Sequence, residues 1–291
     1  MKKLVLSAAI LPVSLSAFAG TYQYEGNLGY TYTKQGDVNA NVGTADATMY
    51  LNAVDDSKGP YAEAAFLNMA SSVHLSYLNA DGDRSRHGDA ENVAADVTYV
   101  TPGEHYIGSL SFIDGESELG GAPKDFDFNG WGVKVGKYIS DRMSMTLDYN
   151  HLDYDDADVK SDSLALNTRF VSFEGSAGES IALDASIGRT NGDSNKDLRA
   201  YWISNSTSAS YDESYNTLAL GTTFYATQQL GLSFRWDRLF GGYNKGDTMK
   251  FGAEYFFMPQ LAASLTYAYA DPDDSNSDSI TSIGVGVTGR F

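Results

Sequence analysis

Apolar and polar residues alternate one by one through residues 280–291, the last segment of the chain. Side chains two positions apart lie on the same face of an extended strand. One face of this segment is therefore apolar and the other is small or polar: Ile283, Val285, Val287 and Phe291 against Gly284, Gly286, Thr288 and Arg290. Such a strand fits a barrel wall whose outer face contacts lipid and whose inner face lines the lumen.

The same two-residue period recurs along the chain from residue 22 onward. In the first such segment the apolar positions are Tyr22, Tyr24, Leu28 and Tyr30, and we expect all four to face lipid. No apolar run approaches the roughly 20 residues that a membrane-spanning helix requires. The pattern predicts an all-β fold, a transmembrane antiparallel up-and-down β-barrel.

Short and long connections alternate between the predicted strands. Long polar segments, which we expect to be outer loops, occupy residues 35–43, 79–92, 114–127, 153–161, 190–212, 239–246 and 271–279. Seven such loops predict about 14 strands, at residues 21–34, 44–54, 72–79, 92–100, 104–113, 128–139, 142–152, 162–172, 180–189, 211–225, 229–238, 247–257, 260–270 and 280–291. The count becomes 12 or 16 if residues 59–72 or 190–212 are misassigned. Fourteen strands should leave an open lumen, since about eight suffice to fill one.

The N-terminal residues predict a secretory signal peptide over residues 1–19, followed by the barrel over residues 20–291. Lys2 and Lys3 precede a short apolar run, and the small residues Ala17 and Ala19 predict cleavage before Gly20. Without the two lysines of this segment, the chain has 18 basic and 38 acidic residues, from totals of 20 and 38. This negative charge would repel nucleic acid. The chain has no cysteine, which excludes disulfides and thiolate metal sites.

Residues 59–68, Gly-Pro-Tyr-Ala-Glu-Ala-Ala-Phe-Leu-Asn, interrupt the strand pattern where a short turn is expected. Their alanine-rich composition favours a short helix, which would be a plug or a periplasmic cap; part of a strand or a packed turn is the alternative. Together with residues 70–73 this segment resembles the putative porins of gammaproteobacteria. The alternating C-terminal strand that ends on Phe291 is similar to the signal that the barrel assembly machinery reads. The resemblance implies a pore-forming barrel in a Gram-negative outer membrane, in contact with lipid and lipopolysaccharide.

Ionisable residues on the polar face of the predicted strands are the candidates for lining the channel. They are Glu25, Asp96, Asp148, Asp184, Asp237 and Glu254 on the acidic side, and Lys134, Arg169, Arg235, Lys250 and Arg290 on the basic side. Opposed acidic and basic walls would favour small polar solutes over apolar ones. The alternative is that these residues form ion pairs between neighbouring strands.

Two predicted loops are rich in aspartate, with Asp153, Asp155, Asp156, Asp158 and Asp162 in or next to one, and Asp271, Asp273, Asp274 and Asp278 in the other. We expect these loops to concentrate cations and to give a weak cation preference. Their spacing lacks the glycine and terminal glutamate of a calcium loop, so we assign no metal site. No cofactor is implied.

Catalysis has little support in the sequence. His151 with Asp153, and His105 with Glu104, are candidate acid–base pairs, and no serine lies in a recognisable nucleophile elbow. We expect a passive channel for ions and small hydrophilic solutes, as a monomer or a homotrimer. A non-conducting surface-binding or adhesion barrel is the main alternative, and an outer-membrane hydrolase is the second.

Overall fold

The computed structural model describes residues 20–82, 89–118, 125–154, 159–173, 179–194, 199–200, 209–210, 214–241, 245–273 and 278–291. The predicted signal peptide lies outside these residues. Within them, no helix is both long enough and apolar enough to cross a membrane.

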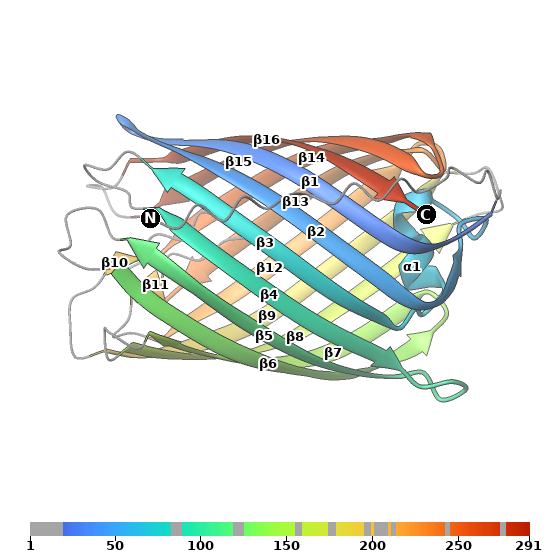
Figure 1. The fold of residues 1–291 in the computed structure, drawn as a ribbon, viewed down its shortest axis with the longest axis horizontal. Coiled ribbons are helices and arrows are strands. Elements are labelled where there is room, and N and C mark those ends of the chain that lie inside the picture. The colour runs from blue at the N-terminus through green and yellow to red at the C-terminus, as the bar shows by residue number, and fades with distance from the viewer. Residues whose placement is uncertain are drawn as a thin grey trace.

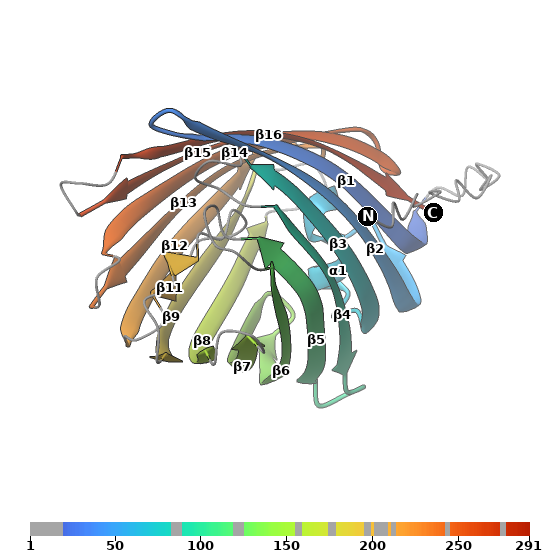
Figure 2. The ribbon, with the colours of Figure 1, turned by 60° about the vertical axis from the view of Figure 1, so that its left-hand side comes forward.

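Fourteen strands form a closed antiparallel barrel (Figures 1 and 2). They are β1 (Thr21–Gln35), β2 (Val38–Asp55), β3 (Ser72–Gly82), β4 (Ala90–Val100), β5 (Tyr106–Glu118), β6 (Asp125–Ser140), β7 (Met143–Tyr154), β8 (Val159–Phe173), β9 (Ser180–Ser194), β12 (Tyr215–Tyr225), β13 (Leu230–Phe240), β14 (Gly246–Met258), β15 (Leu261–Pro272) and β16 (Ile280–Arg290). Two short strands, β10 (Arg199–Ala200) and β11 (Ala209–Ser210), pair separately. The predicted fold class and the count of 14 are confirmed.

The last strand closes the barrel against the first. β16 pairs with β1 from Glu25 opposite Arg290 to Gln35 opposite Ile280. Phe291 continues this contact, because its amide donates to the Tyr24 carbonyl over 2.8 Å. Closure leaves the barrel sheet without a free edge, which would otherwise pair with other chains.

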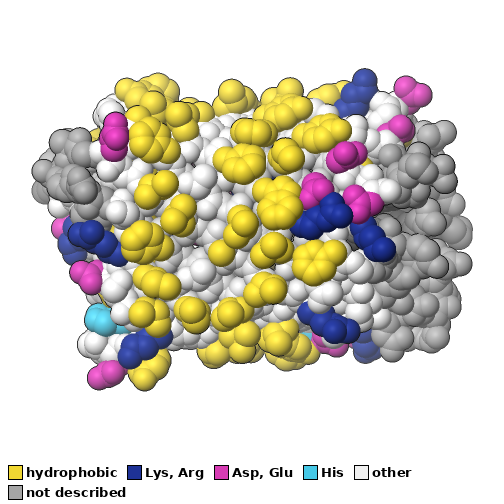
Figure 3. All heavy atoms as spheres, turned by 180° about the vertical axis from the view of Figure 1, so that it is seen from behind, with side chains coloured by type: hydrophobic (Ala, Val, Ile, Leu, Met, Phe, Trp, Pro, Cys, Tyr) yellow, Lys and Arg dark blue, Asp and Glu magenta, His cyan; other side chains and the backbone are white. Residues whose placement is uncertain are grey.

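Large apolar side chains cover the outer wall between the two ends of the barrel (Figure 3). The most exposed of them include Leu28, Phe112, Ile139, Val285 and Leu265. A monomeric soluble protein rarely exposes an apolar surface this large. The band is the lipid-contacting surface that the sequence pattern predicts.

The two ends of the barrel differ. The turn end contains Gly20, Phe291 and the connections 56–71, 101–105, 141–142, 226–229 and 259–260. The loop end contains the opposite strand termini, with β10 and β11 on this side (Figure 1). On the predicted orientation the turn end faces the periplasm.

The prediction of a long loop over residues 35–43 is wrong. β1 and β2 are joined by a tight turn at Gly36, which adopts a φ of +57°, and Val38 already pairs with Gln35. Asn39 and Asn41 of this polar segment lie within β2 and accept hydrogen bonds from outer-wall tyrosines. Tyr30 donates to Asn41 and Tyr32 donates to Asn39, each over 2.6 Å.

The prediction that Tyr22 faces lipid is also wrong. The β1–β2 register shifts between Tyr22 and Tyr24, and this irregularity turns Tyr22 inward. Tyr22 is 3% exposed and packs in a cluster with Tyr50 and Val54.

Candidate functional site

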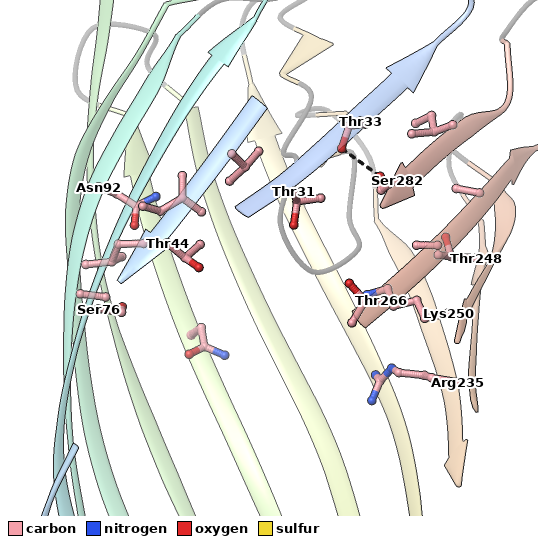
Figure 4. A pocket seen from close by; sticks show the side chains of 18 of the residues that line it. Thr31, Thr33, Thr44, Ser76, Asn92, Arg235, Thr248, Lys250, Thr266 and Ser282 are labelled. Carbon is pink, nitrogen blue, oxygen red and sulfur yellow. Dashed lines mark hydrogen bonds between the residues drawn. The ribbon is translucent and has the colours of Figure 1, made fainter. Parts of the chain in front are cut away.

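A cavity of about 1250 Å³ occupies the lumen between the barrel middle and the loop end (Figure 4). Hydroxyl-bearing side chains from strands around the barrel line it, among them Thr31, Thr44, Ser76, Thr248, Thr266 and Ser282. They point inward because they occupy the small, polar positions of the two-residue period. The cavity offers many weak hydrogen-bonding groups to water and to polar solutes.

The loop-end part of the inner wall is more apolar than the sequence led us to expect. Val38, Val42, Phe128, Tyr154 and Leu239 all line the cavity and are buried. The rings of Phe128 and Tyr154 pack with centroids 5.5 Å apart. Continued alternation through residues 38–42 is the signal that could have extended β2 and found part of this surface.

Arg235 and Lys250 extend into the cavity from the adjacent strands β13 and β14 (Figure 4). Asp237 lies beside them and is 6% exposed. The Arg235 Nε donates to Asp237 Oδ1 over 2.7 Å, and Lys250 Nζ lies 4.0 Å from Asp237 Oδ2. These three predicted residues form one cluster.

Three more of the predicted residues lie on β4, β6 and β7. Lys134 Nζ lies 3.7 Å from Asp148 Oδ2, across the β6–β7 pair. Asp96 accepts a hydrogen bond from Thr98 over 3.0 Å and another from Ser109. Lys134, Asp148 and Asp96 therefore each interact with a side chain on the same strand or on the next one.

Glu25, Arg290 and Glu254 lie toward the turn end. Arg290 Nε donates to Glu25 Oε2 over 2.7 Å, across the β1–β16 pair. The Arg290 guanidinium also lies over the Phe256 ring, 4.7 Å from its centroid. Glu254 is partly buried on β14 and interacts electrostatically with Arg290.

Arg169 and Asp184 form the remaining pair, through Arg169 Nη1 and Asp184 Oδ1 at 2.8 Å. Of the two arrangements that the sequence left open, the geometry matches local ion pairing: most of the cations lie beside a carboxylate of the same or the next strand. The role of these residues in lining a channel stays a prediction.

Residues 56–71, which we call the turn-end segment, extend into the lumen at the turn end. They contain a 3₁₀ helix, Tyr61–Glu63, and a short helix α1, Ala64–Leu67, which lies at the same end as the C-terminus in Figure 1. The predicted short helix is confirmed.

Glu63 is the polar anchor of the turn-end segment and is 1% exposed. Arg169 Nη2 donates to both of its carboxylate oxygens, over 2.6 and 2.7 Å, and the Tyr225 hydroxyl donates to Oε1. Sequence reasoning missed this site, because Glu63 lies outside every predicted strand. Its position among the alanines of residues 59–68 was the one available signal.

Further contacts hold the segment to strands around the barrel. Arg290 Nη1 donates to the Tyr61 carbonyl over 2.8 Å, and the Tyr61 amide donates to the Gln228 carbonyl over 2.9 Å. Leu67 packs against Val171 of β8. The turn-end segment thus lies across the lumen and narrows it.

The candidate acid–base pair of His151 and Asp153 is not formed in the structure. His151 Nδ1 lies 2.9 Å from Asp162 Oδ1, whereas Asp153 accepts from Lys160 over 2.6 Å. His151 shares a face of β7 with the exposed Leu147, so it belongs to the outer wall. Among the described residues, no group of three or more histidine, aspartate or glutamate side chains is arranged to hold a metal ion.

The sequence model of the putative general bacterial porins matches residues 1–287. The chain belongs to this family. A search of curated proteins found no significant match. Family membership and the closed barrel place the protein in the Gram-negative outer membrane, among lipid and lipopolysaccharide, with a porin-type channel role.

Solved outer-membrane barrels share the fold of this porin-family member. The outer membrane protein Omp33 of Acinetobacter baumannii is 20% identical, with a TM-score of 0.63, covering 93% of this chain and 99% of that one. The monoaromatic hydrocarbon channel CymD is 9% identical with a TM-score of 0.54, covering 93% and 89%. A mutant of the monoaromatic hydrocarbon channel TodX is 12% identical with a TM-score of 0.51, covering 93% and 90%.

Proposed function

We propose that the protein is a passive, weakly cation-preferring channel for ions and small hydrophilic solutes. The observation that carries this proposal is the hydroxyl-lined cavity of about 1250 Å³ inside a 14-stranded barrel. A passive channel requires no catalytic group.

The charge of the inner wall supports the cation preference. Carboxylates outnumber cations among its described residues: Glu25, Asp46, Asp96, Asp148, Asp184, Asp237 and Glu254 against Lys134, Arg169, Arg235, Lys250 and Arg290. A net negative lumen raises the local concentration of cations. The aspartates of the loops add to the same field, although Asp153 and Asp273 are paired with Lys160 and Arg238.

The decisive experiment is single-channel recording of the refolded protein in a planar bilayer, first in symmetric KCl and then in a KCl gradient. We expect discrete conductance steps and a reversal potential shifted toward that of K⁺. A reversal potential shifted toward that of Cl⁻ would refute the cation preference.

The turn-end segment favours a second candidate, a non-conducting surface-binding barrel, because it lies across the lumen. A folded barrel that inserts into the bilayer and never conducts would support this alternative. Folding is checked separately by the mobility shift of heated and unheated samples on an SDS gel.

A further inference from the structure

Two cations on the cavity wall share a single carboxylate. Arg235 and Lys250 are directly opposite each other in the β13–β14 register. Like charges at such positions repel each other. Among the residues that the structure describes, Asp237 is the one carboxylate that contacts both, so the cluster carries a net charge of about +1.

The donors of these two cations are mostly unused. Arg235 hydrogen-bonds through Nε alone among the described residues, which leaves both terminal nitrogens of its guanidinium available. Lys250 makes no hydrogen bond within the described part of the chain, and its closest carboxylate oxygen is 4.0 Å away. Arg169 differs, since it donates to both Glu63 and Asp184 at 2.6 to 2.8 Å.

The surroundings leave room for a ligand. The inward neighbours in register are small: Gly221 lies opposite Arg235 and Ala268 lies opposite Lys250. The Asp184 side chain lies over Gly221 on the far side from Arg235, and its Oδ1 is already engaged by Arg169. The hydroxyls of Thr248 and Thr266 line the same cavity (Figure 4). The guanidinium fork suits the two oxygens of a carboxylate, and the ammonium adds a point charge.

We propose that Arg235 and Lys250 form a binding site for small carboxylate-bearing hydrophilic solutes, such as hydroxylated monocarboxylates. The net charge of the cluster matches one carboxylate, and the hydroxyl lining matches the hydroxyl groups of the solute. This inference rests on the proposed function, because it names a solute class for the channel. A weak overall cation preference is compatible with it, since screening confines the field of the cluster to about 8 to 10 Å.

The test compares gluconate with glucose, which are similar in size and hydroxyl content and differ in charge. Binding to the refolded protein in detergent micelles is measured by saturation-transfer NMR titration, which detects weak binding. We expect gluconate to bind about tenfold more tightly than glucose, the gain of one charge-assisted hydrogen bond. Equal affinities would overturn the proposal.

Matched variants locate the site. Lys250→Gln and Arg235→Gln should each weaken gluconate binding about tenfold and leave glucose binding unchanged. Lys134→Gln removes the same charge from an inner-wall lysine that already lies beside Asp148, and should change gluconate binding less than twofold. An equal loss in all three variants would show a general charge effect and would overturn the assignment. If Lys250→Gln fails to fold, Arg235→Gln carries the test.

The binding measurement does not require an open channel, so the two proposals fail separately. Gluconate binding in a barrel that never conducts would refute the channel and keep the site. Conductance without preferential gluconate binding would keep the channel and refute the site.

Discussion

Removing the Glu63 carboxylate should release the turn-end segment and open the lumen. Glu63 is 1% exposed, and its carboxylate joins the turn-end segment to Arg169 of β8 and Tyr225 of β12. Glu63→Ala deletes these contacts and leaves the apolar packing of Leu67 in place.

The size of the effect follows from the burial of the pair. Breaking a buried ion pair by removing one partner costs about 3 to 5 kcal/mol. Arg169 is 35% exposed and keeps Asp184, so the cost here should be lower, about 2 to 3 kcal/mol. Since about 1.4 kcal/mol is a factor of ten, the ratio of released to docked segment should rise roughly 30- to 150-fold.

Single-channel recording measures this ratio as the fraction of time spent in the larger conductance state. The matched control is Glu104→Ala, which removes a glutamate at the same end whose side chain is 76% exposed and lies 3.9 Å from Lys137. Exposed pairs contribute about 0 to 1 kcal/mol, so the control should behave as the wild type.

The reasoning is refuted if folded Glu63→Ala and Glu104→Ala give the same conductance as the wild type. That result would mean that ions pass the segment while it is docked, or that other contacts hold it alone.

Three further predictions concern the wall. Leu28→Arg places a charge on the lipid face at the middle of β1 and should lower the free energy of unfolding by about 2 to 4 kcal/mol. Thr31→Arg, on the lumen face, should lower it much less, and urea titration in lipid vesicles measures both. Gly136→Ala places a methyl group against a backbone carbonyl of the neighbouring strand and should lower the free energy of unfolding by about 1 to 3 kcal/mol. The methyl group of Gly108→Ala meets nothing within 4 Å, so equal thermal stabilities of the two variants would contradict this. Phe291→Ala should reduce the amount of protein assembled in the outer membrane and leave refolding in detergent unchanged, because its backbone bonds to Tyr24 remain; unchanged assembly would refute a recognition role.

Much of the fold was predictable because the two-residue period is a local property. Val285 and Gly286 face opposite sides wherever the strand lies, since successive side chains alternate. Two predictions failed for local reasons. Asn39 and Asn41 are polar but lie within a strand, because they accept hydrogen bonds from outer-wall tyrosines. Tyr22 is apolar but faces inward, because the β1–β2 register is irregular beside it.

The charged site was less predictable. The pattern placed Arg235, Asp237 and Lys250 on one face of neighbouring strands, but register decided which of them are in contact. Glu63 could not be assigned a partner, because Arg169 and Tyr225 are 106 and 162 residues away in the chain.

The sequence by itself determined most of the strands, most of their lipid-facing side chains and a count of about 14, because alternation and connection length are readable along one chain. Only the tertiary structure decided how the charges pair and that residues 56–71 enter the lumen. Barrel closure brings distant strands to one turn end, and the contacts made there depend on shape and register that no local pattern specifies.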